Sequence, residues 1–250
     1  MRESLVMPDR KTGGIFETVK TLVYAVAIAL VVRTFAFEPF NIPSGSMKPT
    51  LLVGDYLFVS KFAYGYSRYS FPLGFNLFSG RIFERVPERG DVVVFKLPSD
   101  GRTDYIKRVI GLPGDKVQVR DGVVYINGER LPQEPIGQFD EDFDGRAVPV
   151  PMLRETLPGG RQHLILDMTP NGSLDNTGVF EVPPGRIFAM GDNRDNSLDS
   201  RVANVGYIPI ENLIGRAELI FFSVNGDASF WQPWTWPWGI RYSRLFSLIH

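Results

Sequence analysis

Two serines lie one residue apart in the segment PSGSMKPTLL, residues 43–52. Its glycine and prolines interrupt the segment too often for a helix interior, and it is too apolar for an ordinary surface loop. A serine hydroxyl becomes an effective nucleophile only when a nearby base accepts its proton. Ser44 and Ser46 are therefore candidate nucleophiles, and the residues alone do not choose between them.

Histidine is the commonest base for such a serine, but the chain has only two histidines, His163 and His250. His163 lies in a weakly patterned stretch, and His250 is the last residue, where order is least expected. We expect both to be solvated surface histidines. A serine–histidine–aspartate triad is therefore not predicted.

A lysine can replace histidine if burial lowers its pKa from ~10.4 to about 7–8. Lys107 stands in the apolar run YIKRVIG, and alternation along a strand puts it on one face with Tyr105 and Val109. Arg108 then points the other way. An edge-strand lysine that blunts aggregation is the alternative, and this segment alone does not decide between the two. Three other lysines are candidates for the base: Lys48, Lys61 and Lys96. Lys48 lies beside a proline and is expected to be a solvated charge.

A third polar segment, GDNRDNSLDSR, covers residues 191–201. Its aspartates and asparagines raise the question of calcium, but the glycine and glutamate of an EF-hand loop are missing and two arginines intrude. We interpret it as a turn held by Asp and Asn side chains and by Arg–Asp pairs. Within it, Ser197 could hold the lysine amine in line with the nucleophile.

The composition narrows the class of protein. The 250 residues carry a net charge of −1, so the charge balance does not point to nucleic acid as a partner. The 25 glycines and 19 prolines favour strands and loops over helices. The absence of cysteine excludes disulfides, thiolate metal sites and a cysteine nucleophile. We expect neither a metal nor a cofactor.

An unbroken apolar run, LVYAVAIALVV, occupies residues 22–32 between Lys20 and Arg33. The 13 helical steps between these charges span roughly 20 Å. Snorkelling of both side chains, and the further length of residues 15–40, make a ~30 Å hydrocarbon layer spannable. We predict an uncleaved anchor; a cleaved signal peptide and a buried core helix are the alternatives. Four basic residues precede the run, so positive-inside counting places the N-terminal tail in the cytoplasm.

Strand patterns dominate the rest of the chain. We expect strands over residues 56–64, 91–97, 104–112, 186–192 and 217–224. Residues 65–87 read as a long loop or hairpin, and a DG step within 116–128 predicts a hairpin. Residues 129–176 are polar and weakly patterned, as in an insertion.

All four tryptophans fall in WQPWTWPWG, residues 231–239. Indole rings favour the headgroup level of a bilayer, so these residues could seat the soluble part on the membrane. Packing of a proline-broken loop on the core is an equally good interpretation. The residues concerned are Trp231, Trp234, Trp236 and Trp238.

The segments PSGSMKPTLL, YIKRVIG and GDNRDNSLDSR, together with RGDVVVFKLP at residues 89–98, closely resemble bacterial type I signal peptidases. The likeness covers roughly residues 38–117 and 185–248, in the family's order. It implies a mostly β fold: a single transmembrane helix, then an antiparallel β catalytic domain with an inserted small β subdomain. The expected divisions are a cytoplasmic tail at 1–14, an anchor at 15–37, the catalytic domain at 38–120 and 182–250, and the insertion at 121–181.

The resemblance implies roles for single residues. Ser46 becomes the nucleophile and Lys107 the general base, Ser44 supports the oxyanion hole with the Ser46 amide, and Ser197 orients Lys107. The pairs Arg108–Asp192 and Asp199–Arg201 look like the family's structural ion pairs. Pocket walls carried over from the family are Phe40, Ile42, Pro43, Met47, Leu51, Leu57, Val94, Tyr105 and Ile106.

The implied activity is removal of signal peptides from exported preproteins at the outer face of the bacterial plasma membrane, after a small–x–small pattern such as Ala-x-Ala. The partners are then preproteins and the lipid bilayer, without nucleic acid. Two alternatives remain: a self-cleaving repressor-type serine–lysine protease, which the anchor disfavours, and a non-enzymatic anchored β domain that binds exported chains.

Overall fold

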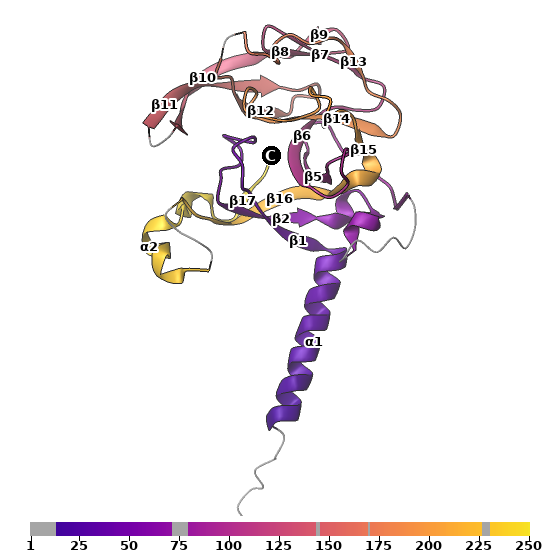
Figure 1. Cartoon of the computed structure of the whole chain (residues 1–250), viewed down its shortest axis with the longest axis vertical. Helices are drawn as coiled ribbons and strands as arrows, with labels where there is room; N and C mark the ends of the chain where they lie inside the picture. The colour runs from indigo at the N-terminus through magenta and orange to yellow at the C-terminus, as the bar shows by residue number, and fades with distance from the viewer. Residues whose placement is uncertain (1–13, 72–79, 144–145, 170, 227–230) are drawn as a thin grey trace, which may run out of the picture.

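The computed structural model describes residues 14–71, 80–143, 146–169, 171–226 and 231–250 (Figure 1). Its long helix α1 (Gly14–Phe35) projects from a mostly β domain. The 22 residues rise about 33 Å, and their 18-residue apolar window has a mean hydropathy of 2.0 and is 0% buried. Within the described residues this is the single helix with the length and composition to cross a membrane. The mostly β fold with one apolar N-terminal helix is therefore as expected.

The main sheet is antiparallel and runs in the order β1-β2-β16-β5-β6-β14-β15, with β17 paired to β16. The segment that carries Ser46 follows β1, Lys107 lies within β6, and the loop of residues 191–201 follows β14. Its strands are β1 (Phe37–Asn41), β2 (Asp55–Ser60), β5 (Val92–Lys96), β6 (Asp104–Gly111), β14 (Arg186–Met190), β15 (Ile208–Pro209), β16 (Leu213–Ser223) and β17 (Ser247–Leu248).

Two further sheets lie at the end of the domain opposite α1 (Figure 1). One has the order β13-β7-β8-β9 and the other β10-β11-β12; a small β3-β4 pair completes the set. Their strands are β3 (Tyr66–Ser67), β4 (Arg81–Ile82), β7 (Lys116–Arg120), β8 (Val123–Ile126), β9 (Glu129–Arg130), β10 (Gln133–Phe143), β11 (Arg146–Thr156), β12 (Gln162–Leu166) and β13 (Phe180–Glu181). A short helix, α2 (Trp236–Gly239), lies toward the α1 end.

The hairpin predicted at the DG step is confirmed: Asp121 and Gly122 have φ of 49° and 76°, as a two-residue type I′ turn requires, and join β7 to β8. The strand expected over 56–64 is shorter, because the chain turns into a 3₁₀ helix at Lys61–Ala63. Residues 65–87 contain the β3-β4 pair; part of this stretch, 72–79, lies outside the described residues.

Strand β6 is the structural centre of the site because hydrophobic clusters cover it from several sides. Val109 packs in one cluster with Phe95 and Ile187, whereas Ile110 packs in another with Phe188. Residues 108–111 are buried on both faces of the sheet. Polar side chains that enter this strand are therefore withdrawn from water and need partners inside the protein.

Candidate active site

The side chains of Ser46 and Lys107 are in direct contact. The segment carrying Ser46 follows β1, and Lys107 is central in β6, opposite Val93 of β5. The Lys107 Nζ lies 2.6 Å from the Ser46 Oγ and also 2.9 Å from the carbonyl oxygen of Ile106. The Oγ atoms of Ser44 and Ser46 are 3.5 Å apart. Two segments separated by 61 residues thus place a hydroxyl against an amine.

The Lys107 side chain is withdrawn from solvent, with 3% of the residue exposed. Burial lowers the pKa of this amine to about 8, against the opposing effects of Asp199 and Asp192. Its Nζ lies 5.5 Å from the Tyr105 ring centre, in line with the shared strand face. A substantial fraction of this lysine is therefore neutral near pH 8, and a neutral amine can accept a proton.

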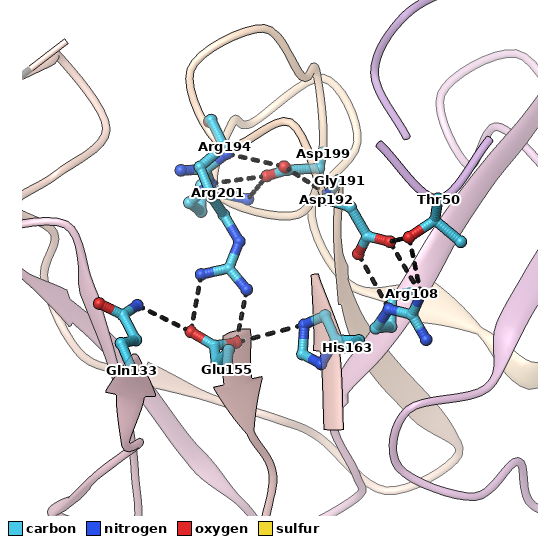
Figure 2. Close-up of polar contacts among 10 residues, drawn as sticks. All are labelled: Thr50, Arg108, Gln133, Glu155, His163, Gly191, Asp192, Arg194, Asp199 and Arg201. Atoms are coloured by element: carbon cyan, nitrogen blue, oxygen red, sulfur yellow. Dashed lines mark hydrogen bonds and ion pairs between the residues drawn. The ribbon is translucent and has the colours of Figure 1, made fainter. Parts of the chain in front are cut away.

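Arg108, on the other face of β6, is fully buried and pairs with Asp192. Its Nε and Nη2 donate to the two carboxylate oxygens at 2.9 and 2.8 Å, and Thr50 Oγ1 donates to Asp192 at 2.5 Å (Figure 2). Burial opposes ionisation of Asp192, but the Arg108 charge outweighs it and lowers the carboxyl pKa. The pair joins β6 to the segment after β14.

Asp199 and Arg201 form a second buried pair in the same segment, with Nε and Nη2 at 2.9 and 2.8 Å from the carboxylate oxygens. Asp199 also accepts a hydrogen bond from the Gly191 amide at 3.0 Å, which closes the loop on itself. Burial raises and the Arg201 contacts lower the Asp199 pKa, and the net shift is downward. The loop is thus held in one shape by charge.

Gly191 lies where this loop meets the segment that carries Ser46. A Cβ at this position would approach the carbonyl oxygen of Ser46 to 2.5 Å and would overlap the Ser197 side chain. The Asn193 amide donates to that same carbonyl at 3.1 Å. Ser197 is buried, and its Oγ has no hydrogen-bond partner within the described residues. The structure therefore brings Ser197 beside the pair without a bond to Lys107.

A cavity of about 620 Å³ opens beside Ser46 and Lys107. Six of the nine residues expected as pocket walls line it: Phe40, Ile42, Pro43, Val94, Tyr105 and Ile106. The other three, Met47, Leu51 and Leu57, are fully buried in the core cluster behind it. Sequence reasoning did not assign several further lining residues that adjoin or lie in polar loops, where no periodicity marks a wall, among them Ser173, Leu174, Asp195, Asn196 and Leu198.

His163 is not the solvated surface residue that the sequence suggested. It is 5% exposed on β12, and its Nε2 lies 3.4 Å from Glu155 of β11 (Figure 2). Burial lowers its pKa, against the opposing effect of Glu155. The expectation was wrong because His163 lies opposite Glu155 in the β11-β12 pair, and Glu155 in turn binds Arg194 of the distant loop after β14, so this polar stretch is covered.

Glu155 is the centre of this buried network. Arg194, in the loop between Asp192 and Ser197, donates to both of its carboxylate oxygens at 3.0 and 2.5 Å, and Gln133 donates at 3.0 Å (Figure 2). Burial opposes ionisation of Glu155, but Arg194 and His163 lower its pKa overall. The backbone adds a bridge between β12 and the loop, where Leu166 bonds to the peptides of residues 192 and 194 at 2.9 Å. The β10-β11-β12 sheet thus holds the loop of residues 191–201 in place.

Lys48 is a second link to that sheet. The sequence suggested a solvated charge, but its side chain is 17% exposed and forms an ion pair with the buried Glu141 of β10. The expectation was wrong because the partner lies 93 residues away. The segment that carries Ser46 and Lys48 and the loop of residues 191–201 are therefore both bound to the β10-β11-β12 sheet.

Comparison of the chain with known proteins identifies its family. The profile of the family described as signal peptidase, peptidase S26, matches residues 15–222. Signal peptidase I of Rickettsia typhi is 43% identical over 250 residues, with 91% of each chain covered, and that of Rickettsia akari is 47% identical over 212 residues, covering 81% and 77%. A solved signal peptidase I from Enterococcus faecalis aligns with 53% of this chain and 97% of its own, at 27% identity and a TM-score of 0.32, too low to support conclusions about the fold.

These matches define the chain as a peptidase of the serine endopeptidase class. It belongs to the signal peptidase family, peptidase S26.

The Glu155–Arg194 pair yields a prediction about stability. Glu155→Gln leaves the buried Arg194 charge without its counter-ion, which should lower the free energy of unfolding by about 3–5 kcal/mol and slow peptide cleavage, because the loop loses its support. Thermal unfolding and cleavage by the full chain in detergent measure both effects. Glu134→Gln, on the same sheet in an exposed pair with Arg154, is the control and should cost at most ~1 kcal/mol. Equal losses in the two variants would contradict this role of Glu155.

Proposed function

We propose that this protein is a membrane-anchored serine endopeptidase that removes signal peptides from exported preproteins, with Ser46 as nucleophile and Lys107 as base. The observation that carries the proposal is the 2.6 Å contact between a serine hydroxyl and a buried lysine amine whose pKa is about 8. Membership of the family supports the substrate class. We further propose residues 38–120 and 182–250 as the catalytic domain and 121–181 as its insertion.

The first step is attack of the Ser46 Oγ on the scissile carbonyl carbon while the proton passes from Oγ to the neutral Lys107 amine. One N–H of that amine can remain on the Ile106 carbonyl, 2.9 Å away, which fixes the direction of the lone pair. The carbonyl oxygen becomes an oxyanion, for which Ser44 and the Ser46 amide are the proposed donors. The Lys107 ammonium then gives its proton to the departing amine.

The second step releases the product. Lys107, neutral again, takes a proton from water, whose oxygen attacks the ester carbonyl carbon of the acyl-enzyme. The bond from that carbon to the Ser46 Oγ then breaks, the Lys107 ammonium returns its proton to Oγ, and the cleaved chain leaves with a new carboxyl group. Ser197 is the proposed positioning residue for the amine, since it lines the cavity and its buried hydroxyl has no other partner within the described residues. The two Arg–Asp pairs keep geometry and move no proton.

Specificity for small side chains fits the apolar cavity walls. An extended substrate that adds as a strand would receive affinity from its backbone, while alternate side chains enter the cavity. The walls contributed by Ile42, Val94 and Ile106 leave room for methyl groups close to Ser46. Shape alone discriminates by only ~1–3 kcal/mol per methylene. Placement of enzyme and substrate in one membrane therefore contributes to selectivity.

Substitution of the pair tests the proposal directly. Ser46→Ala and Lys107→Arg should each lower cleavage of a preprotein with an Ala-x-Ala site by about 10⁴-fold or more, because an arginine keeps its proton. Ser44→Ala should lower it by about 10²-fold. Purified full chain in detergent is assayed by gel shift, with the exposed Lys116→Arg as control. Comparable cleavage by Lys107→Arg would overturn the assignment, and no cleavage by the unsubstituted protein would favour a non-enzymatic binding domain.

The pH dependence follows from the lysine. The reactive form is the neutral amine, so kcat/KM should rise about tenfold per pH unit below a midpoint near 8 and level off above it. A rate profile from pH 6 to 10 on a short uncharged-side-chain peptide measures the midpoint. A midpoint near 10.5, the ordinary lysine value, would show that burial does not tune this amine.

The proposed topology places the N-terminal tail in the cytoplasm and the β domain outside, with the tryptophan segment at the bilayer surface. Support comes from the basic residues before α1, from the exposed Trp231, Trp234 and Trp238, and from the place of α2 toward the α1 end (Figure 1). Trp236 instead packs on Phe222, with ring centres 5.1 Å apart.

Because the chain has no cysteine, single introduced cysteines report this topology. A membrane-impermeant maleimide should label Arg130→Cys in spheroplasts without lysis, since β9 is exposed at the end far from α1. Gln232→Cys, equally exposed in the protein, should react at least threefold more slowly because the headgroup layer covers it. Labelling of Arg130→Cys only after lysis would reverse the orientation, and equal rates would remove the tryptophan segment from the interface.

A further inference from the structure

A second cavity, of about 900 Å³, lies beside the active-site cavity and shares Phe40 and Asp104 with it. It is bordered by the end of α1, by β1 and by the β5-β6 turn. Five cationic side chains line it: Arg33, Lys61, Arg68, Lys96 and Arg102. Three carboxylates oppose them: Glu38, Asp100 and Asp104. The lining therefore has an excess of positive charge that nothing in the proposed peptide cleavage uses.

The carboxylates do not neutralise the cations evenly. Glu38 is shared by Arg33 and Lys61, at 2.9 and 2.8 Å. Lys96 pairs with Asp104 at 2.7 Å. Within the described residues the Arg102 guanidinium has no ion pair, although its backbone amide donates to Asp100.

Arg68, whose side chain is 40% exposed and forms a long ion pair with Glu211, offers one further free donor. Its Nη2 donates to the Tyr69 hydroxyl at 2.6 Å, but its Nε is buried and has no hydrogen-bond partner within the described part of the chain. Glu211 is 3.9 Å from that Nε, too far for a hydrogen bond. An N–H donor without an acceptor, in the same cavity as a guanidinium that has no ion pair within the described residues, is the arrangement that an anionic oxygen would complete.

The position of this cavity relative to a bilayer is set by α1. Arg33 lies in the last turn of the helix, and the helix end is fixed to the domain by a Tyr66 hydroxyl bond to the Phe35 carbonyl at 2.7 Å. If α1 spans the hydrocarbon layer, its last turn lies at the level of the headgroups. Phe37 and Phe62 are exposed beside it, with ring centres 5.5 Å apart, as suits an apolar rim in that layer.

We propose that this cavity binds the phosphate headgroup of an anionic phospholipid, with Arg68 and Arg102 as its main donors. A phosphate oxygen is the acceptor that guanidinium groups bind best, and the lipid is the source because the cavity lies at headgroup depth. The proposal rests on α1 as a membrane span and is independent of the Ser46–Lys107 chemistry. Its consequence is that a bound lipid holds the site at a fixed height above the bilayer.

Native mass spectrometry of the full chain in detergent tests the site, with phosphatidylglycerol as the titrated lipid. The unsubstituted protein should bind one such lipid at least tenfold more tightly than phosphatidylcholine. Arg102→Gln should weaken that binding about fivefold, the effect of one cation at a membrane surface. Arg102→Lys should keep most of it. Arg130→Gln, on β9 at the opposite end, is the matched control and should change nothing.

Four outcomes would overturn the proposal. Equal affinity for the zwitterionic lipid would show that charge does not select the ligand, and equal weakening by Arg130→Gln would show a general charge effect. Displacement of the lipid by ~10 mM inorganic phosphate would make this a free-phosphate site. Displacement by a peptide with an acidic segment before an Ala-x-Ala site would make it a substrate subsite instead. Unchanged thermal unfolding of each variant confirms that the fold is intact, and a loss of peptidase activity alone leaves these results unaffected.

Discussion

The structure depends on one lysine amine that is kept out of water beside a hydroxyl. A pKa near 8 in place of 10.5 means that the folded protein binds the Lys107 proton less tightly than the unfolded chain does, so protonation of this amine favours the unfolded state. This costs about 3 kcal/mol at pH 7, at ~1.36 kcal/mol per pKa unit. The amine itself does not increase the free energy of unfolding, so packing of the surrounding protein must offset this cost. Burial of both faces of β6 by separate hydrophobic clusters does so.

The charged groups around the amine are arranged so that they do not restore its proton. Asp192 and Asp199 would raise the Lys107 pKa, but each is engaged by its own buried guanidinium, Arg108 and Arg201. The same pairs join β6, β14 and the loop after it. A third pair, Glu155–Arg194, extends the chain of contacts to the β10-β11-β12 sheet. The three pairs therefore act together to fix the loop, and the effect of Asp199 and Asp192 on the Lys107 pKa stays smaller than the effect of burial.

The parts of this site that local sequence specifies could be predicted, and those that depend on distant partners could not. The apolar run around Lys107 marks a buried strand, and the DG step marks a turn, because both signals lie within a few residues. The surroundings of His163 and Lys48 depend on Glu155 and Glu141, which no local pattern selects. Strand β11 is exposed over most of its first half, so it lacks the alternation that betrays a strand with one buried face. The three core residues Met47, Leu51 and Leu57 follow the apolar pattern of a wall, yet only the tertiary packing decides which apolar residues face the cavity.

On the proposed function, the short connection between α1 and the segment of Ser46 suits a substrate that is itself held in a membrane. Only Ala36 separates α1 from β1, and its carbonyl accepts the Lys61 amide at 2.9 Å, so helix and strand are joined rigidly. Five extended residues of β1 advance about 17 Å from the helix end toward the segment of Ser46. A substrate chain that leaves the bilayer beside α1 and pairs along these strands covers the same distance in about five residues. On this proposal β1 and the segment that follows it link the end of α1 to the scissile bond, and the cavity walls select the side chains found there.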